Sequence, residues 1–138
     1  MKLKYSAQKP SAKNFLELFE TTGWNSTYQL SAKELLTAIQ NSWYYISVYD
    51  DKKLIGFGRI VCDGVVHALI LDMIILPKYQ GNGIGKELLD RLVKKCLEHK
   101  IRDIQLFCAK DKKEFYEKYG FVSRPENAPG MEIKLILG

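Results

Sequence analysis

The chain has 138 residues, a length that favours a single folded domain. Hydrophobic residues make up 46% of the chain and charged residues 27%, which is typical of globular proteins and excludes wholesale disorder. The 21 lysines and arginines exceed the 16 acidic residues, and the net charge of +5 indicates an anionic partner: nucleic acid, a membrane surface or a phosphorylated small molecule.

The N-terminal part of the chain is predicted to hold one strand and two helices. Residues 2–5 alternate polar and apolar side chains, as a short strand does. Ser11 is a candidate cap for the first helix, which the segment 21–25 ends. Ser31 and Glu34 have the spacing of a capping box, so we expect the second helix to begin there.

The middle of the chain is predicted to form three antiparallel strands. Residues 43–49 and 54–62 are rich in aromatic and β-branched side chains, which favour strands. The Asp-Gly dipeptide at positions 63–64 indicates a two-residue hairpin turn that leads to a third strand over residues 65–76. Pro77 ends this strand because proline has no N–H to donate to a neighbour.

The last part of the chain is predicted to alternate helices and strands. Helical spacing covers residues 84–97, a strand covers 103–108, a helix covers 113–119, and a final strand covers 131–137. A helix that links two strands implies a parallel crossover in an otherwise antiparallel sheet. The predicted fold class is α+β, a single domain with a mixed, mostly antiparallel central sheet flanked by about four helices.

The cysteines and histidines argue against a disulfide or a metal site. Cys62, Cys96 and Cys108 are odd in number, far apart and without a CxxC pair, which predicts free thiols in a reducing cytoplasm. The sequence has two histidines and no HExxH motif, so we predict no metal. No apolar stretch approaches the roughly 20 residues of a membrane span, and the N-terminus lacks the apolar core of a signal peptide.

The most informative segment covers residues 71–86, where a strand, a turn with three glycines and the start of a helix follow one another. Glycines let the backbone come close to a ligand, and the first amides of a helix point outward without partners. The helix dipole adds partial positive charge at the same end, and Lys78 and Lys86 flank the turn. This pattern predicts a binding site for a pyrophosphate group.

Two common phosphate-binding motifs do not fit this turn. A dinucleotide-binding GxGxxG motif that starts at Gly81 would need glycine or alanine where Lys86 stands. A Walker A loop needs four residues between its first glycine and its Gly-Lys pair, whereas three lie between Gly81 and Gly85. That loop also needs serine or threonine where this sequence has Glu87.

Two separated motifs match one known family instead. The turn has the pattern Gln/Arg-Gly-x-Gly-x-Gly after a strand that ends in apolar-x-Pro, and residues 115–121 read Phe-Tyr-Glu-Lys-Tyr-Gly-Phe. With both motifs the sequence closely resembles the GNAT N-acetyltransferase superfamily, strongly over residues 54–122 and weakly over 1–50. The resemblance implies the GNAT fold, with its crossover at the cofactor cleft. It also implies acetyl-coenzyme A as co-substrate and direct acetyl transfer to an amine.

The resemblance also implies which residues bind the cofactor. Backbone groups at the end of the third strand pair with pantetheine beside a bulge, and the amides of the turn bind the pyrophosphate. The residues at these positions are Ile74, Ile75, Leu76, Gln80, Gly81, Asn82, Gly83, Ile84, Gly85 and Lys86.

Two residues are candidates for the chemistry itself. Tyr116 stands where the family often has a tyrosine near the thioester sulfur, which can protonate or hydrogen-bond the leaving thiolate. An amine must be neutral to attack, so a base or a water relay is needed, and Asp72 on the third strand is our candidate. Ala109 departs from the pattern, because many members have an asparagine there.

The acceptor is expected to be a small primary amine. No acidic cluster that would select a polycation is present, and Trp24 and Tyr28 are candidate substrate-binding residues in the loop between the first two helices. Packing in the core is the alternative for these two aromatic residues.

Three other functions are compatible with the same fold class to different degrees. A protein N-terminus or lysine as acceptor stays open, and so does a non-catalytic acetyl-coenzyme A sensor. A nucleic-acid-binding module is disfavoured because the basic residues are scattered among acidic ones. We therefore predict neither a nucleic-acid nor a membrane partner. Dimers are frequent in the family, so a homodimer with residues 131–137 at its interface is a further hypothesis.

Overall fold

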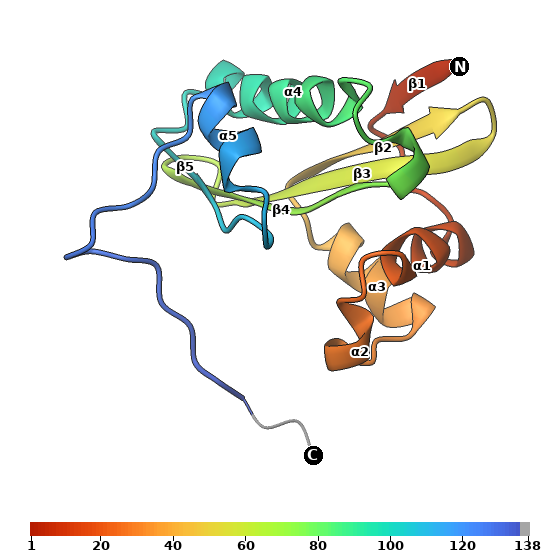
Figure 1. The fold of residues 1–138 in the computed structure, drawn as a ribbon, viewed down its shortest axis with the longest axis horizontal. Helices are drawn as coiled ribbons and strands as arrows, with labels where there is room; N and C mark the ends of the chain where they lie inside the picture. The colour runs from red at the N-terminus through yellow and green to blue at the C-terminus, as the bar shows by residue number, and fades with distance from the viewer. Residues whose placement is uncertain (136–138) are drawn as a thin grey trace. The chain divides into compact units, whose positions relative to one another are not determined.

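The computed structural model describes residues 1–135, which form two compact units that divide after Leu106. The first unit holds a five-stranded sheet in the order β1-β2-β3-β4-β5 (Figure 1). All neighbours are antiparallel except the parallel pair of β4 and β5, as predicted. The strands are β1 (Leu3–Ser6), β2 (Tyr44–Asp50), β3 (Lys53–Cys62), β4 (His67–Ile75) and β5 (Asp103–Leu106).

The described residues form five α-helices and one 3-10 helix, where about four helices were expected. The first unit contains α1 (Ala12–Glu20), α2 (Asn25–Tyr28), α3 (Ala32–Gln40), the 3-10 helix η1 (Pro77–Tyr79) and α4 (Ile84–Glu98). The second unit contains α5 (Lys113–Tyr119). The additional element is α2, a single turn in the segment that we predicted to be a loop.

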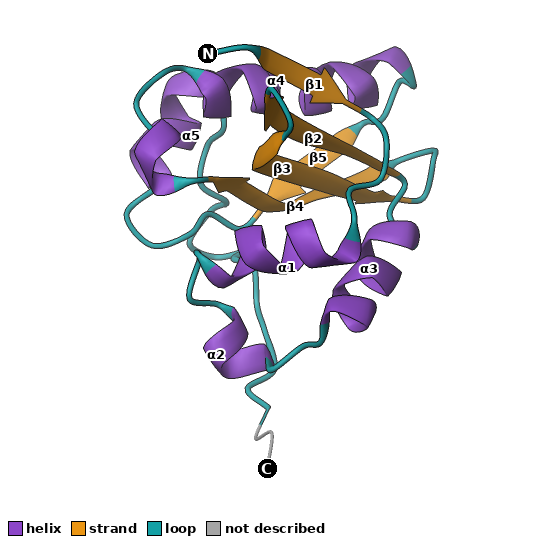
Figure 2. Ribbon diagram, turned by 90° about the vertical axis from the view of Figure 1, so that its right-hand side faces the viewer, coloured by secondary structure: helices purple, strands orange, loops and turns teal. Residues whose placement is uncertain are grey.

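Helices cover both faces of the sheet in the first unit. Helices α1 and α3 pack on one face and α4 packs on the other (Figures 1 and 2). The predicted apolar stripes account for this arrangement, because each stripe is buried against the sheet. The buried stripe residues are Phe15, Leu18, Phe19, Leu35 and Ile39 on one side, and Ile84, Leu88, Leu89, Leu92 and Cys96 on the other.

Both predicted helix caps are confirmed. The Ser11 hydroxyl accepts a hydrogen bond from the backbone N–H of Asn14 at 3.1 Å. Ser31 Oγ accepts from the N–H of Glu34 at 3.1 Å, and Glu34 Oε1 accepts from the N–H of Ser31 at 3.0 Å. Each cap satisfies N–H groups that have no partner within the helix, and this fixes where the helix begins.

The predicted two-residue turn between β3 and β4 is wrong. Strand β3 ends at Cys62 and β4 begins at His67, so the loop has four residues instead of two, and Cys62 pairs with Ala68. Asp63 explains the longer loop, because its Oδ1 accepts hydrogen bonds of 2.7–3.1 Å from the backbone N–H groups of residues 65–67. These bonds, of which the one from Val65 contributes most, hold the pKa of the Asp63 carboxyl below its usual value. The longer loop shifts the whole register of β3 against β4.

The predicted final strand is also wrong as far as the structure describes it. Residues 121–135 contain no helix or strand, and positions 136 and 137 of the predicted strand lie outside the described residues. Met131, Ile133 and Leu135 are 88%, 86% and 74% exposed. Alternation of apolar residues favours a strand only where a neighbouring strand supplies hydrogen bonds, and no such neighbour pairs with residues 131–135.

No helix within residues 1–135 has both the length and the apolar character needed to cross a membrane. The organisation of all 138 residues as one domain stays a prediction.

Candidate functional site

The third predicted strand, β4, carries a bulge in the middle of the sheet. Phe57 pairs with Ile74, whereas Arg59 pairs with Leu71, so two residues of β4 lie opposite Gly58 alone. Such an extra residue leaves part of the strand unpaired and bends it. The bulge therefore redirects the last residues of β4, towards the glycine-rich turn.

An ion pair closes this bulge. Asp72 is one of the two extra residues and has a positive φ of 53°, which is unusual for a residue other than glycine. Its Oδ2 accepts a hydrogen bond of 2.6 Å from Nε of Arg59, and the side chains of Asp72 and Arg59 are only 25% and 16% exposed. Nη1 of Arg59 also donates to Ser42 Oγ at 3.3 Å. The candidate base is thus held by a guanidinium group, which sequence reasoning had not identified.

Gly58 lies at the bulge, where an added side chain would force its neighbours to shift. A Cβ atom at this position would lie 2.8 Å from Leu92 Cδ1 and 2.9 Å from Met73 Sδ. Both contacts are shorter than carbon and sulfur atoms tolerate. The bulge is therefore packed tightly against α4, and the strand on one side of it is fixed relative to that helix.

Beyond the bulge, β4 has an open edge. The parallel pairing with β5 joins residues 67–70 to residues 103–106 and stops there. Among the described residues, no strand pairs with the later part of β4 on that side. An open strand edge can accept an extended ligand as though it were another strand.

Ile75 is the residue whose backbone groups face this open edge. The N–H of Leu76 donates to the carbonyl of Ile55 at 2.8 Å, and hydrogen-bonding directions alternate along an antiparallel strand. The N–H and C=O of Ile75 therefore point away from β3, while those of Ile74 and Leu76 point towards it. The side chain of Gln80 donates to the carbonyl of Ile75 at 3.0 Å.

The turn that follows exposes a row of backbone N–H groups. Gly81 and Gly83 have positive φ angles of 82° and 78°, which only glycine adopts easily. The N–H of Gln80 bonds to the carbonyl of Pro77 and that of Glu87 bonds to the carbonyl of Gly83. Between them, no hydrogen bond found within residues 1–135 uses the N–H groups of residues 81–86. These N–H groups lie where the sequence predicts an anion site, and the amide of Gln80 is not among them.

The charges and the side chain of Asn82 complete the turn. Asn82 Nδ2 donates to the carbonyls of Tyr79 and Gln80 at 3.1 and 3.3 Å, which holds the turn in one conformation. Lys78 and Lys86 are exposed on either side, as predicted. An anion here would meet the exposed amides of the turn, the positive end of the α4 dipole and two cations.

Tyr79 anchors the turn to the sheet. Its hydroxyl donates a hydrogen bond of 2.6 Å to Oδ2 of Asp50, the last residue of β2. This bond is the main reason that the pKa of the Asp50 carboxyl is lowered and the pKa of the Tyr79 hydroxyl is raised.

We expect Tyr79→Phe to lower the denaturation midpoint in urea at neutral pH, with little effect in strong acid. A lowered folded-state pKa stabilises the protein above the carboxyl's ordinary value of about 4, and this contribution is lost as the pH falls through the lowered pKa. Urea titrations at both pH values test this, with Tyr28→Phe as a control, because Tyr28 is 57% exposed. An equal difference between Tyr79→Phe and the wild type at both pH values would contradict the prediction.

The two candidate acceptor residues lie in different surroundings. Trp24 packs against the cluster of α1 and α3, with its ring 5.9 Å from that of Phe19. Tyr28 ends α2 and is largely exposed. The structure thus gives Trp24 a packing role, and an acceptor role for either residue stays a prediction.

Tyr116 lies on α5 in the second unit. Its ring contacts those of Phe115 and Phe121 at centroid distances of 5.0 and 6.0 Å. Burial, with a smaller contribution from the Cys108 thiol, raises the pKa of Tyr116 to about 12. The phenol is therefore fully protonated at neutral pH and able to donate a hydrogen bond.

Comparison with known proteins decides the family. The sequence model described as Acetyltransferase (GNAT) domain matches residues 41–123. The uncharacterized N-acetyltransferase ycf52 of Pyropia yezoensis is 34% identical over 119 residues, which cover 83% of this chain and 67% of that one. The chain belongs to the GNAT acetyltransferase family. It is an acyltransferase domain, and its mixed sheet is the GNAT fold that the two motifs implied.

Other GNAT proteins differ in length and in name. Histone acetyltransferase TAP1 of Glycine max is 32% identical over 125 residues, covering 83% of this chain and 53% of that protein. GCN5-related N-acetyltransferase 2, chloroplastic, of Arabidopsis thaliana is 41% identical over 81 residues, covering 59% of this chain and 31% of that one. This GNAT chain thus spans from about a third to two thirds of these relatives.

A solved structure shares the fold. The paia N-acetyltransferase of Thermoplasma acidophilum, in complex with coenzyme A, has a TM-score of 0.71 to this chain and is 21% identical. The match covers 90% of this chain and 92% of that one.

Proposed function

We propose that this GNAT domain binds acetyl-coenzyme A and transfers its acetyl group directly to a primary amine of a small molecule. The observation that carries the proposal is the row of N–H groups of residues 81–86, which have no partner within residues 1–135, at the end of a strand with an open edge. A pyrophosphate needs many donors in a small space, and an extended pantetheine arm needs a free strand edge. The GNAT fold, and a member of that fold solved with coenzyme A, support the same ligand.

Different residues would bind the pyrophosphate and the pantetheine of the cofactor. The amides of residues 81–86 and the Lys86 ammonium would hold the pyrophosphate. The backbone N–H and C=O of Ile75 would pair with pantetheine, because those of Ile74 and Leu76 are directed to β3. Gln80 then has to release the Ile75 carbonyl when pantetheine approaches from that side. Ile74 and Leu76 would contribute through packing and position.

Tyr116 is proposed to stabilise the thiolate that leaves when the amine attacks the thioester. An alkyl thiol ionises near 8.5, whereas the pKa of Tyr116 is raised to about 12, so complete proton transfer to the thiolate is uphill in this environment. The phenol then acts chiefly as a hydrogen-bond donor to the developing negative charge.

We expect Tyr116→Phe to lower kcat roughly 100-fold, with a smaller change in the KM for acetyl-coenzyme A, because the lost bond matters most in the transition state. Steady-state kinetics with thiol detection measure both values. The pH profile of the wild type should show no Tyr116 limb at neutral pH, since its raised pKa keeps it protonated there. Tyr119→Phe, on the same helix, is the control. Unchanged turnover in Tyr116→Phe would remove the role.

A panel of amines tests the proposed reaction. The purified protein is incubated with acetyl-coenzyme A and an arylalkylamine, a polyamine, an amino sugar or a lysine-containing peptide, and both thiol release and product mass are measured. Acetylation of a small amine supports the proposal. Acetylation of the peptide alone would contradict the proposal and indicate a protein acetyltransferase. The relative TAP1 is named as a histone acetyltransferase. Thermal stabilisation by acetyl-coenzyme A without any product would indicate a sensor.

The partners and the compartment follow from the same proposal. We propose that no nucleic acid or membrane takes part, so DNA and RNA should give no thermal shift. The cysteines Cys62, Cys96 and Cys108 are free, which supports a reducing compartment such as the cytoplasm, although one relative is named as chloroplastic. A homodimer is proposed only because dimers are frequent in the family. Residues 131–135, which were expected to form an interface strand, form no strand.

A further inference from the structure

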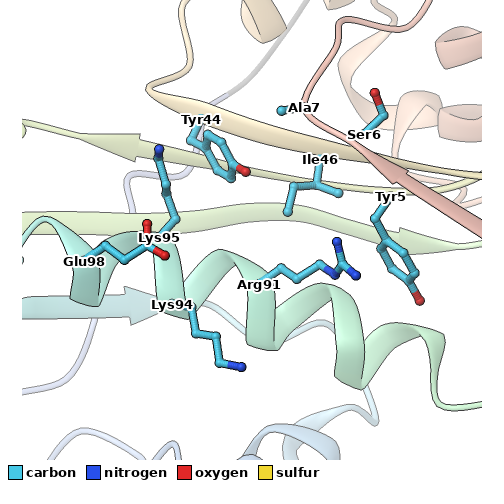
Figure 3. A pocket seen from close by; sticks show the side chains of 9 residues that line it. All are labelled: Tyr5, Ser6, Ala7, Tyr44, Ile46, Arg91, Lys94, Lys95 and Glu98. Carbon is cyan, nitrogen blue, oxygen red and sulfur yellow. The ribbon is translucent and has the colours of Figure 1, made fainter.

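A pocket lies between α4 and the strands β1 and β2, separate from the glycine-rich turn (Figure 3). Its volume is about 260 Å³. The basic residues that line it begin at Arg91, about two helical turns beyond Ile84, where α4 starts. The pocket combines aromatic and charged side chains, chiefly Tyr5, Tyr44, Ile46, Arg91, Lys95 and Glu98.

Two cations in this pocket lie over tyrosine rings. The guanidinium carbon of Arg91 is 4.3 Å from the centre of the Tyr5 ring, and the Lys95 ammonium is 4.8 Å from that of Tyr44. Both side chains reach from α4 towards the strands (Figure 3). Cation–π contacts at these distances restrain long side chains that are otherwise free to move. The charges are therefore positioned before any ligand arrives.

These cations retain unused binding capacity. Arg91 donates to Glu87 through Nε alone, at 2.8 Å, so both of its Nη groups stay available within residues 1–135. None of the ion pairs found in that part of the chain includes Lys95. Lys94 differs, because it pairs with Asp90 at 2.9 Å and its amino group points away from the strands (Figure 3).

The side chains that line the pocket carry more positive than negative charge. Strands β1 and β2 contribute only neutral side chains to the lining, and α4 contributes three cations and one carboxylate, Glu98. Glu87 and Asp90 lie outside the lining and hold part of Arg91 and Lys94. The cations that face the strands thus outnumber the lining acid, so an anion is favoured over a cation.

We propose that this pocket is a second anion site that binds a small organic phosphate, independently of the cofactor turn. The Nη groups of Arg91 and the ammonium of Lys95 hold the phosphate, since a guanidinium fork and an ammonium both suit phosphate oxygens. The organic part of the ligand packs on Tyr5, Tyr44 and Ile46. The volume exceeds what a bare phosphate needs, and the aromatic walls favour a ligand with an apolar or planar body.

Phenyl phosphate and inorganic phosphate are the probes, followed through backbone amide shifts by NMR. We expect both to shift the amides of residues 5–7 and 91–98, and phenyl phosphate to bind about fivefold more tightly, because its ring packs on the tyrosines. Sodium acetate separates phosphate from carboxylate chemistry and should bind more weakly than phosphate. Shifts confined to residues 81–86 would place the probes at the cofactor turn and overturn the proposal.

Variants that remove a positive or a negative charge from the pocket lining test the proposal further. Lys95→Gln should weaken phenyl phosphate binding about fivefold, since one charge-assisted bond is lost at a partly solvated site. Glu98→Gln should strengthen it, because the lining acid repels the ligand. Lys33→Gln on α3 changes the net charge as Lys95→Gln does but is remote from the pocket, and should have no effect. Equal binding by all three variants would overturn the proposal.

Discussion

Gly83→Ala should weaken acetyl-coenzyme A binding about tenfold or more, because charge-assisted bonds from turn amides contribute roughly 1.5–3 kcal/mol each. Gly83 has a φ of 78° and heads α4 without a side-chain cap. Alanine adopts this conformation at a cost of about 1–2 kcal/mol, so the turn relaxes and its amides no longer point together. Calorimetric titration with acetyl-coenzyme A measures the effect.

Gly64→Ala is the matched control for this experiment. Gly64 has nearly the same φ, 80°, and a Cβ atom at either glycine has no neighbour within 4 Å. Both variants should therefore lose similar stability, while only Gly83→Ala loses cofactor affinity. Equal cofactor affinity in the two variants would show that the turn does not hold the cofactor.

Arg59→Gln should cost about 2 kcal/mol of stability, since it leaves a mostly buried carboxylate without its cation. It should also lower kcat/KM roughly 10- to 100-fold, because the bulge that directs the end of β4 relaxes and small displacements are costly in catalysis. Denaturant unfolding and steady-state kinetics measure the two effects. Lys118→Gln is the control, because it removes an exposed ion pair with Glu114, and it should change stability by at most about 0.5 kcal/mol.

The same pair decides the role of Asp72. If Asp72 supports the bulge through Arg59, then Asp72→Asn and Arg59→Gln lower kcat/KM by similar factors at every pH, and the double variant is little worse than either single one. If Asp72 is the base, Asp72→Asn removes the acidic limb of the pH profile and Arg59→Gln does not. The two outcomes exclude each other, and either one assigns the residue.

Local patterns predicted most elements of the first unit, whereas the register of its sheet needed a contact that no pattern reveals. The capping box of Ser31 and Glu34 depends on residues three apart, so sequence alone suffices. The β3–β4 register depends on Asp63, whose side chain takes three backbone hydrogen bonds and lengthens the loop.

The consequence of that register is the pair at the bulge. With a two-residue turn, Cys62 would face Val65 and Arg59 would face Ala68. With the observed register Arg59 faces Leu71, beside Asp72, and the side chains of Arg59 and Asp72 are close enough to form the ion pair. The nearest signal in the sequence was an opposite charge on the neighbouring strand, which is informative only once the register is known.

In the candidate site too, local sequence patterns predicted some features and could not predict others. The row of amides at residues 81–86 was predictable, because three glycines before a helix leave few other arrangements. The side-chain bonds from Gln80 to Ile75 and from Tyr79 to Asp50 were not, since both amide and phenol side chains have many alternative acceptors.

Asp50 joins the beginning of the chain to the cofactor turn. One of its carboxylate oxygens accepts from the hydroxyl of Tyr79, and the other accepts from the backbone N–H of Lys2 at 2.9 Å. The first residues of the chain and the turn thus bind the two oxygens of one carboxylate and together orient it. Changes at the first few residues, such as an affinity tag or a truncation, therefore alter the carboxylate that holds Tyr79 and the glycine-rich turn, and kinetic constants should be compared only between proteins with the same N-terminus.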